Sequence, residues 1–328
     1  MLVILRGLAA DSLTGASMSA RLETICQRDN CIVIARTRQA ESATAARPLM
    51  LAAARGGRES YTLEHRRLAV DDDNFLLLND GRAHASLIRS ETHVETFKIF
   101  FRAGMADEVL APLVMPADRL LEREFPFDRF GFEFCEGLRP HDRLVSPVLR
   151  YIRHHALAGS DDVAWFDEQL SYLLERLLLE HREIVRKVQA IPYARAGTRK
   201  EIYRRVALAV DYIESCYEQP IDLDTLAQVA CMSKFHFLRA FRSLQGVTPQ
   251  NYVQRKRALV AKRLLATTAL STVEITLRVG YASRTSLTKQ VRYWTGTAPA
   301  EIRRRIALEA NSAATQFRHS LSANPASE

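Results

Sequence analysis

The chain has 328 residues, of which 47% are hydrophobic and 26% charged, a composition that excludes a wholly disordered chain and a membrane protein. Its length suits two domains of ordinary size. The net charge of +8 is concentrated, since residues 198–305 contain 19 Lys and Arg against 8 Asp and Glu, and the remainder is slightly acidic. A basic domain beside a weakly acidic one indicates a polyanionic partner, with nucleic acid ahead of an anionic membrane.

The first twenty residues predict no targeting segment. The apolar stretch 1–10 is short and is interrupted by Arg6, so it favours neither a signal peptide nor a membrane span. Residues 1–20 are expected to form a disordered extension. The five cysteines have no spacing typical of a disulfide framework or a zinc site, which favours a reducing, cytoplasmic location. They are Cys26, Cys31, Cys135, Cys216 and Cys231.

Residues 21–190 are expected to form a β-rich domain that ends in helices. Between residues 31 and 134 the apolar side chains come in short runs, such as 31–35, separated by turn-forming clusters such as 55–58. This spacing is typical of an antiparallel sandwich or barrel. The sequence therefore predicts an all-β core.

Residues 161–190 predict a long amphipathic helix, because apolar side chains recur there every three or four residues. Its leucine-rich face allows two interpretations: it packs on the β-rich core, or it pairs with the same helix of a second chain to form a homodimer. Residues 191–198 break the pattern and are expected to form a linker. The apolar positions are Phe166, Leu170, Leu173, Leu174, Leu177, Leu178, His181, Ile184 and Val188.

Residues 199–308 are expected to form an all-α domain of seven helices, followed by a disordered tail over 309–328. Capping residues and helix-opening prolines recur along this stretch. The predicted helix starts lie at Thr198, Asp222, Ser233, Thr248, Thr272, Ser283 and Pro299.

One segment of this domain is duplicated, and each copy has a short helix, a tight turn and a second helix that ends in Gly-x-x-Pro. Cys231 and Gly280 occupy the equivalent turns, at an offset of 49. The sequence therefore predicts two helix-turn-helix units in tandem. At an offset of 50, Phe237, Arg239, Phe241, Arg242, Gly246 and Pro249 match Leu287, Lys289, Val291, Arg292, Gly296 and Pro299.

The geometry of such units predicts how they meet DNA. The second helix of each unit enters the major groove with its N-terminal residues facing the base edges. The helix between the units, from Pro249 to about Ala266, spans about 26 Å at 1.5 Å per residue, which is comparable with the roughly 34 Å repeat of DNA. The two reading helices are therefore expected in adjacent major-groove segments on one face of a duplex.

The stretch from Leu226 to Arg242, followed by Gly246–Pro249, resembles the AraC/XylS family of regulators, and so does the stretch from Ile275 to Ser283 with Gly296–Pro299. The resemblance spans about residues 200–305. It implies a sequence-specific transcription regulator, not an enzyme, that binds double-stranded promoter DNA and acts on RNA polymerase. No cofactor is expected.

The resemblance also implies base-edge contacts from the third and sixth helices of the domain. Arg239 and Lys289 are equivalent in the two copies, which favours contact over simple solvation of the helix surface. Phe237 and Phe241 are interpreted as core residues, because they lie four apart on the face opposite Arg239. The expected DNA-binding residues are Lys234, Phe235, His236, Leu238, Arg239, Arg284, Thr285 and Lys289. The expected phosphate contacts are Ser233, Arg255, Arg257 and Ser283.

The second unit departs from the family pattern. It has Leu287 and Val291 where aromatic residues are usual, and Thr276 where Ala is usual. These changes are expected to preserve folding, but they leave the first unit as the main expected source of specificity.

For the first domain, the stretch from Val70 to Asn79 resembles cupin-type sensor domains. This resemblance implies a cupin-like barrel that binds a small-molecule effector or mediates dimerisation.

Two alternatives to a regulator remain open. A cupin-type metalloenzyme with a DNA-binding appendage requires clustered His and carboxylate ligands, whereas His65, His84 and His93 are isolated, so no metal site is expected. A membrane-surface role for the basic helices is disfavoured, because the faces of Phe237 and Phe241 are needed for a core.

Overall fold

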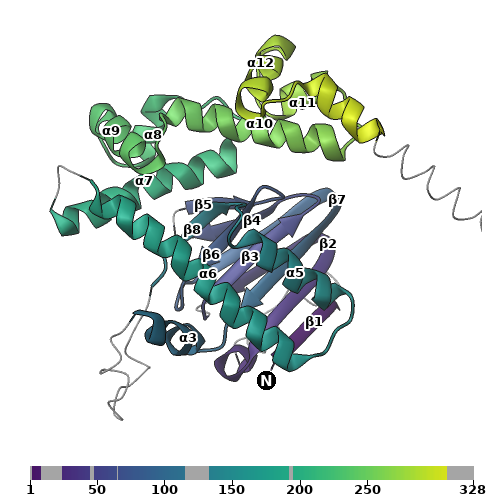
Figure 1. Ribbon diagram of the computed structural model, residues 1–328, viewed down its shortest axis with the longest axis vertical. Helices are drawn as coiled ribbons and strands as arrows, with labels where there is room; N and C mark the ends of the chain where they lie inside the picture. Colours follow the sequence, from purple (N-terminus) through teal and green to yellow (C-terminus); the bar gives the residue numbers. More distant parts are fainter. Residues whose placement is uncertain are drawn as a thin grey trace, which may run out of the picture.

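The first domain of the computed structural model is built on one curled β-sheet, and the second is helical (Figure 1). The structure describes residues 2–8, 24–44, 48–64, 66–114, 133–191 and 195–308. The predicted tail 309–328 lies outside these residues, as do residues 9–20 of the predicted extension.

The sheet has eight strands, with the order β1-β2-β7-β3-β6-β8 along its main path. The β4–β5 hairpin branches from this path, because β4 pairs with the first part of the long, bent β7. The strands are β1 (Leu2–Leu8), β2 (Asn30–Thr44), β3 (Met50–Arg55), β4 (Glu59–Leu63), β5 (Arg66–Val70), β6 (Asn74–Leu78), β7 (His84–Phe100) and β8 (Gly137–Pro140).

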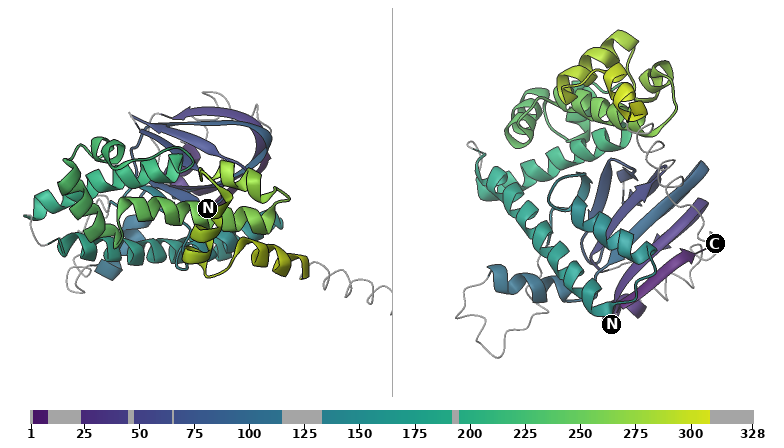
Figure 2. Two further views of the ribbon diagram at one scale, coloured as in Figure 1. Left: turned by 90° about the horizontal axis from the view of Figure 1, so that it is seen from above. Right: turned by 45° about the vertical axis from the view of Figure 1, so that its right-hand side comes forward.

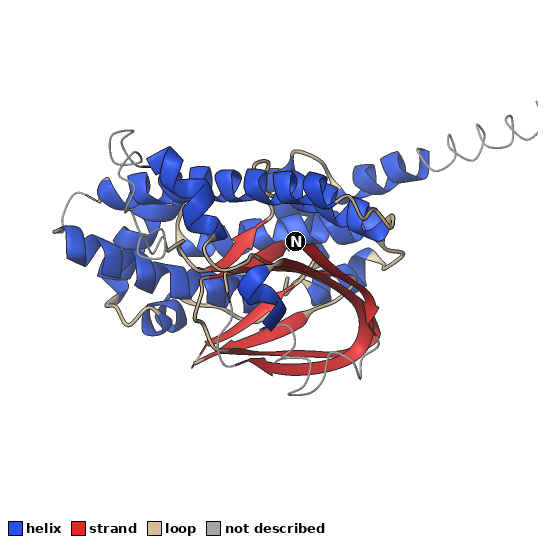
Figure 3. Cartoon of the chain, turned by 90° about the horizontal axis from the view of Figure 1, so that it is seen from below, coloured by secondary structure: helices blue, strands red, loops and turns tan. Residues whose placement is uncertain are grey.

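Both faces of this sheet are apolar. On β7, alternate residues such as Phe97 and Ile99 point into a core shared with helices, whereas Val94 and Phe100 point into a second core on the inner side of the curl. The continuous apolar run 31–35 on β2 supplies both cores in the same way. One face therefore needs a covering of helices, and the other buries itself by curling (Figure 3).

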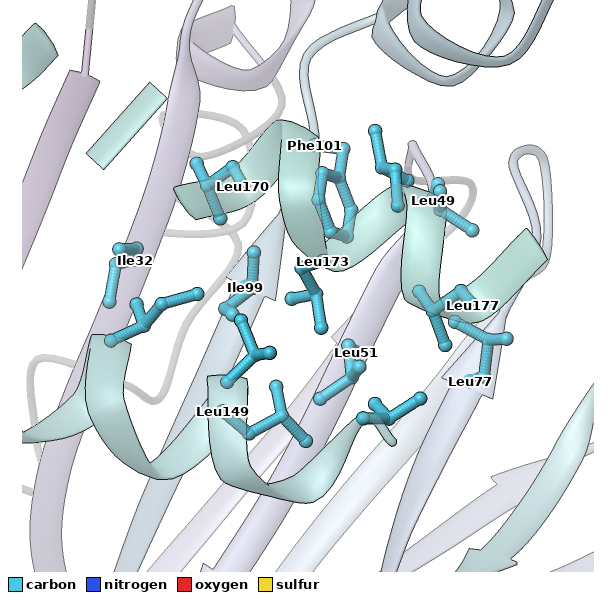
Figure 4. Packing of buried hydrophobic residues seen from close by; sticks show 14 of the residues in the cluster. Ile32, Leu49, Leu51, Leu77, Ile99, Phe101, Leu149, Leu170, Leu173 and Leu177 are labelled. Atoms are coloured by element: carbon cyan, nitrogen blue, oxygen red, sulfur yellow. The ribbon is translucent and has the colours of Figure 1, made fainter. Parts of the chain in front are cut away.

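The covering helices are α5 and α6, with α3 beside α6. The leucine-rich face of α6 is fully buried against the sheet, where Leu170, Leu173 and Leu177 meet Ile99 and Leu51 (Figure 4). Of the two interpretations of this face, packing on the β-rich core is the one that the structure shows. The helices are α3 (Met105–Val114), α5 (Ser146–Leu157) and α6 (Val163–Gln189).

The second domain lies across one end of the sheet (Figures 1 and 2). Its first helix, α7, packs against β5 and β8 and therefore joins the two domains. The helices are α7 (Ala196–Cys216), α8 (Leu223–Val229), α9 (Lys234–Gln245), α10 (Pro249–Thr267), α11 (Thr272–Arg278) and α12 (Arg284–Thr295), and residues 299–308 are also helical.

Two expectations need correction. Leu2–Leu8 is not part of a disordered extension, because it forms β1 and pairs in parallel with the apolar start of β2 from Leu2 opposite Asn30 onward. The predicted barrel is not closed, since the main path of the sheet ends at β1 on one side and β8 on the other. The short apolar stretches that predicted a barrel supply side chains to both faces of the sheet. In the structure one of these faces packs against helices.

Two features are absent from the part of the chain that the structure describes. None of the helices there combines the length and the hydropathy that crossing a bilayer requires. The same residues contain no group of three or more His, Cys, Asp or Glu side chains placed to hold a metal ion.

Candidate nucleic-acid interface

The first helix-turn-helix unit consists of α8, a tight turn and α9. Asp222 caps α8 by accepting a hydrogen bond from the Thr225 backbone N–H at 2.7 Å, as its sequence position predicts. Cys231 makes the turn with a positive φ of 50°. Phe237 and Phe241 are both buried and form an edge-to-face pair, which confirms their interpretation as core residues.

The second unit repeats this plan with α11 and α12. Ser271 and Glu274 form a capping box at the start of α11, since each side chain accepts the backbone N–H of the other residue. Ser283 caps α12 by accepting from the Ser286 N–H at 3.2 Å. Leu287 and Val291, the two departures from the aromatic pattern, are fully buried and keep the core role of Phe237 and Phe241.

The turn of the second unit is more constrained than that of the first. Gly280 has a φ of +77°, and a Cβ atom at this position would lie 2.2 Å from the backbone oxygen of Glu218. That oxygen lies just after α7, so Gly280 allows a close approach between the second unit and the end of α7. The equivalent Cys231 is exposed.

The predicted base-reading residues occupy the outward face of α9. Lys234, Phe235, His236 and Arg239 are exposed, and Phe235 has 86% of its surface accessible, which is unusual for so large an apolar side chain. Lys234 forms an ion pair with Asp224 of α8. Leu238 is half-buried, so it presents less surface than its neighbours.

On α12, the predicted residues Arg284, Thr285 and Lys289 are all exposed. Lys289 and Arg239 take equivalent places in the two units, on the side opposite the buried residues. All of these side chains are exposed while the second domain is docked on the sheet, so the docking leaves the outward faces of α9 and α12 accessible.

Sequence reasoning missed two exposed arginines on the same helices, Arg242 on α9 and Arg292 on α12. Each lies three residues after Arg239 or Lys289, and therefore on the same side of its helix. The signal was present in the offset of 50, which matches these two arginines.

The predicted phosphate contacts divide into two groups. Ser233, Arg255 and Ser283 are exposed, as a phosphate contact requires. Arg257 is buried, and its guanidinium donates to the carbonyl oxygens of Tyr217, Gly280 and Gln219 at 2.7 to 2.8 Å. Its predicted phosphate role is therefore wrong, because the side chain ties α10 to α7 and to the turn of the second unit. The sequence of the basic stretch on α10 did not indicate which of its side chains are buried.

Lys256, beside Arg257, is also buried and forms an ion pair with Glu214 of α7 at 2.5 Å. Burial alone would lower the pKa of Lys256, but Glu214, Asp71 and Asp73 raise it above its ordinary value. The ammonium group therefore stays charged inside the protein, at the junction between α7 and α10.

The linker helix α10 separates the two units. Its 19 residues span about 28 Å at 1.5 Å per residue. α12 lies on the side of α10 away from the sheet in both Figure 1 and the right-hand view of Figure 2. The arrangement thus presents two exposed, basic helices at a separation set by α10.

Comparisons with known proteins agree with this geometry. A family model described as a helix-turn-helix domain matches residues 226–305. The probable transcription factor PqrA of Proteus vulgaris is 32% identical over 83 residues, which are 25% of this chain and 68% of PqrA. The HTH-type transcriptional regulator GbdR of Pseudomonas aeruginosa is 26% identical over 212 residues, which are 62% of this chain and 54% of GbdR.

Among solved structures, the DNA-binding domain of AdpA, a global transcriptional factor crystallised with a target DNA, is 35% identical. The match covers 33% of this chain and 95% of that domain, with a TM-score of 0.29.

Two helix-turn-helix units on one linker helix define a tandem helix-turn-helix protein, which is the class that the fold and the exposed basic helices indicate. The chain belongs to the AraC/XylS family of DNA-binding transcription regulators, which confirms the resemblance seen in the sequence. These relatives are named as regulators, in agreement with the expectation that the chain is not an enzyme. The chain spans about half the length of several curated relatives that it matches, GbdR among them.

Proposed function

We propose that this protein regulates transcription by reading promoter DNA in two adjacent major-groove segments, one with α9 and one with α12. One observation carries the proposal: the predicted reading residues of both helices are exposed, apart from the half-buried Leu238, while each helix buries its opposite face in a hydrophobic core. The surplus of positive charge in residues 198–305 supplies the attraction to phosphates that all duplex binding needs.

The side chains divide between specificity and positioning. Arg239 and Lys289 suit the paired acceptors of guanine, and Arg284 and Thr285 lie at the N-terminal end of α12, which enters the groove first. Lys234, Phe235, His236 and Leu238 complete the reading face of α9, and Ser233, Arg255 and Ser283 contact phosphates.

Selection from a random duplex library tests this proposal. The full-length protein, at physiological salt, is expected to enrich two short blocks of sequence whose centres lie about one helical turn, or about 10 base pairs, apart. Enrichment of no sequence, with only salt-dependent binding to every duplex, would contradict the proposal, because that is the behaviour of non-specific phosphate binding.

The inner face of the sheet supports a further role, control by a small-molecule effector. Glu59 and Lys98 form an ion pair of 2.6 Å there, both well buried, and the Thr96 hydroxyl donates to Glu59 at 2.6 Å. A buried charged cluster on the largely apolar inner side of the curl is the kind of polar anchor that orients a ligand in a cupin-like domain. Thermal-shift screening of metabolites against the wild type and Glu59→Gln tests this role, since a specific effector stabilises only the wild type.

We also propose the partner and the location that a promoter-binding regulator requires: it acts on RNA polymerase, in the cytoplasm. We propose a homodimer through residues 161–190, using the outer side of α6, because its leucine face is occupied by the sheet. Tyr172 and Leu179 are 39% and 40% exposed on that outer side. Sedimentation of the wild type and of Leu179→Glu tests the dimer, which the substitution is expected to weaken.

A further inference from the structure

The two helix-turn-helix units have separate hydrophobic cores. The core of the first is built by α7, α8 and α9, and that of the second by α10, α11 and α12. The linker helix contributes Val253 to the first core and the stretch Ala258–Leu265 to the second. The angle between α9 and α12 therefore depends on how α10 is held against α7, because no single core encloses both units.

The N-terminal half of α10 is held inside the second domain. Lys256 forms its buried ion pair with Glu214, and the Tyr252 hydroxyl donates to the same carboxylate at 3.0 Å. Arg257 adds its three hydrogen bonds to backbone carbonyls. These contacts fix one end of the linker helix to α7.

The C-terminal half of α10 is held by the sheet. Arg263 donates from Nε and Nη2 to the two carboxylate oxygens of Asp73, at 2.9 and 2.8 Å, and its Nη1 lies 3.4 Å from Asp72. This is the two-pronged arrangement in which an arginine binds a carboxylate most strongly. All three side chains are at least 70% buried, so solvent screens the contact only in part.

The acidic turn that receives Arg263, residues 71–73 between β5 and β6, is itself ordered by hydrogen bonds. The Asp73 backbone N–H donates to the Asp71 carboxylate at 2.9 Å, and the Gly56 N–H donates to Asp72 at 3.2 Å. The carboxylates therefore need little rearrangement to bind the guanidinium of Arg263.

The hairpin strand that leads into this turn also holds α7. Arg66 of β5 pairs with the buried Asp211 of α7 at 3.2 Å, and the Ala69 backbone N–H donates to the Ser215 hydroxyl at 3.0 Å. Figure 1 shows β5 lying directly against α7. Residues 66–73 form one short segment of the sheet. This segment thus contacts both α7, which shares the core of the first unit, and the linker helix α10.

We propose that the acidic turn 71–73 acts as a positioning element for DNA recognition: by fixing α10 relative to α7, it sets the spacing of the two DNA half-sites that the protein accepts. This inference rests on the proposed function of α9 and α12. Asp72, Asp73 and Arg263 are positioning residues that do not themselves touch DNA. One base pair adds about 3.4 Å and a rotation of about 36°, so even a small swing of α12 changes the preferred spacing.

The test uses full-length protein and the duplex that the wild type selects. One or two base pairs are inserted or removed between the two sequence blocks, and dissociation constants are measured at each spacing. The wild type is expected to lose about tenfold in affinity with one inserted base pair. Arg263→Met and Asp73→Asn are both expected to bind the duplex of original spacing about fivefold more weakly than the wild type does. The dissociation constants of each variant are expected to differ by less than about threefold among the spacings.

Two controls separate positioning from other effects. Lys262→Met removes one positive charge from the neighbouring residue of the same helix, and it is expected to lower affinity equally at every spacing. A duplex with only the block read by α9 is expected to bind the wild type and both variants equally, which shows that the variants are folded.

Asp73→Asn distinguishes positioning from phosphate binding by Arg263. This substitution makes the protein more positive, so a phosphate role for Arg263 predicts unchanged or tighter binding, and predicts that Arg263→Met behaves as Lys262→Met does. Either result overturns the inference, as does a wild-type spacing profile in both variants. If the wild type selects no sequence, the proposed function of α9 and α12 fails together with the inference. If the wild type selects a site and the variants keep its spacing profile, only the inference fails.

Discussion

At the scale of single residues, the turns of the two helix-turn-helix units give a natural comparison. Both turn residues have a positive φ, 50° for Cys231 and 77° for Gly280. Only Gly280 also sits against another backbone, that of Glu218. Two requirements for glycine, conformation and space, are therefore combined in the second unit, whereas the first unit has only the conformational one.

Gly280→Ala is expected to destabilise the protein by at least about 2 kcal/mol, because the added methyl group meets a backbone atom that cannot move without shifting α7. Cys231→Gly is expected to change stability by less than about 1 kcal/mol, because the relief of the left-handed conformation is offset by the greater freedom of glycine in the unfolded chain. Urea unfolding of the two variants measures both effects. Equal effects at the two positions would contradict the close approach at Gly280.

Arg239 and Arg255 test the division between base and phosphate contacts. Arg239→Ala is expected to cost about 1 to 3 kcal/mol of binding free energy and to relax the preference at one or two base pairs. Arg255→Ala is expected to weaken binding to all duplexes alike and to reduce the slope of log K against log salt by about 1. Competition assays with the selected site and its point variants measure both. An unchanged site preference in Arg239→Ala would remove this residue from the base-reading set.

At the scale of helices and strands, the sequence predicted the two helix-turn-helix units because their signals are local. The predicted linker 191–198 and the predicted helix start at Thr198 were wrong, since α7 already begins at Ala196. The offset of 50 located both units, and the caps at Asp222, Thr248 and Ser283 mark helix starts through hydrogen bonds that span only three residues. The buried pair Phe237 and Phe241 followed from helical periodicity alone.

Features that depend on distant parts of the chain were not predictable in this way. Arg257 looked like its exposed neighbour Arg255, and only the approach of α7 and the turn at Gly280 gives it three carbonyl partners. The first strand needed β2 as a partner 28 residues away, Leu2 opposite Asn30. The leucines of α6 fitted a dimer as well as a sheet, because amphipathicity does not say what covers the apolar face.

The junction of α7 and α10 gives a prediction at this scale. Lys256→Met is expected to destabilise the protein by about 3 kcal/mol or more, because it leaves the Glu214 carboxylate buried without its cation. Glu214→Gln in the same chain removes that charge and keeps an acceptor for Tyr252. The double variant is therefore expected to be more stable than Lys256→Met, and denaturant unfolding measures the difference. A double variant less stable than Lys256→Met would show that the pair is not coupled.

At the scale of the whole molecule, Asp211, which joins α7 to the sheet, makes the stability of the folded protein depend on pH. Burial raises the pKa of this carboxyl to about 6, although the Leu138 backbone N–H, Arg66 and Arg139 favour its charged form. Since the ordinary value is 3.8, the folded state binds more protons than the unfolded state between these two values. The contribution of Asp211 to stability is therefore fully present below pH 3.8 and is lost as the pH rises through 6.

Asp211→Asn removes this titration and keeps an acceptor for Leu138. Relative to the variant, the wild type is expected to lose about 2 kcal/mol of unfolding free energy between pH 4 and pH 7. Other groups titrate equally in both proteins, so the difference between their unfolding curves isolates Asp211. Parallel curves across that range would show that the buried carboxyl keeps its ordinary pKa in the folded protein.

The separate cores of the two units have a consequence for how such a regulator changes during evolution. Substitutions that remodel the packing under α12 leave the packing under α9 intact, because the two cores share no buried residue. Under the proposed function, one of the two DNA half-sites can then change while the other is still bound, so that affinity for the original target is partly retained while a new target is acquired.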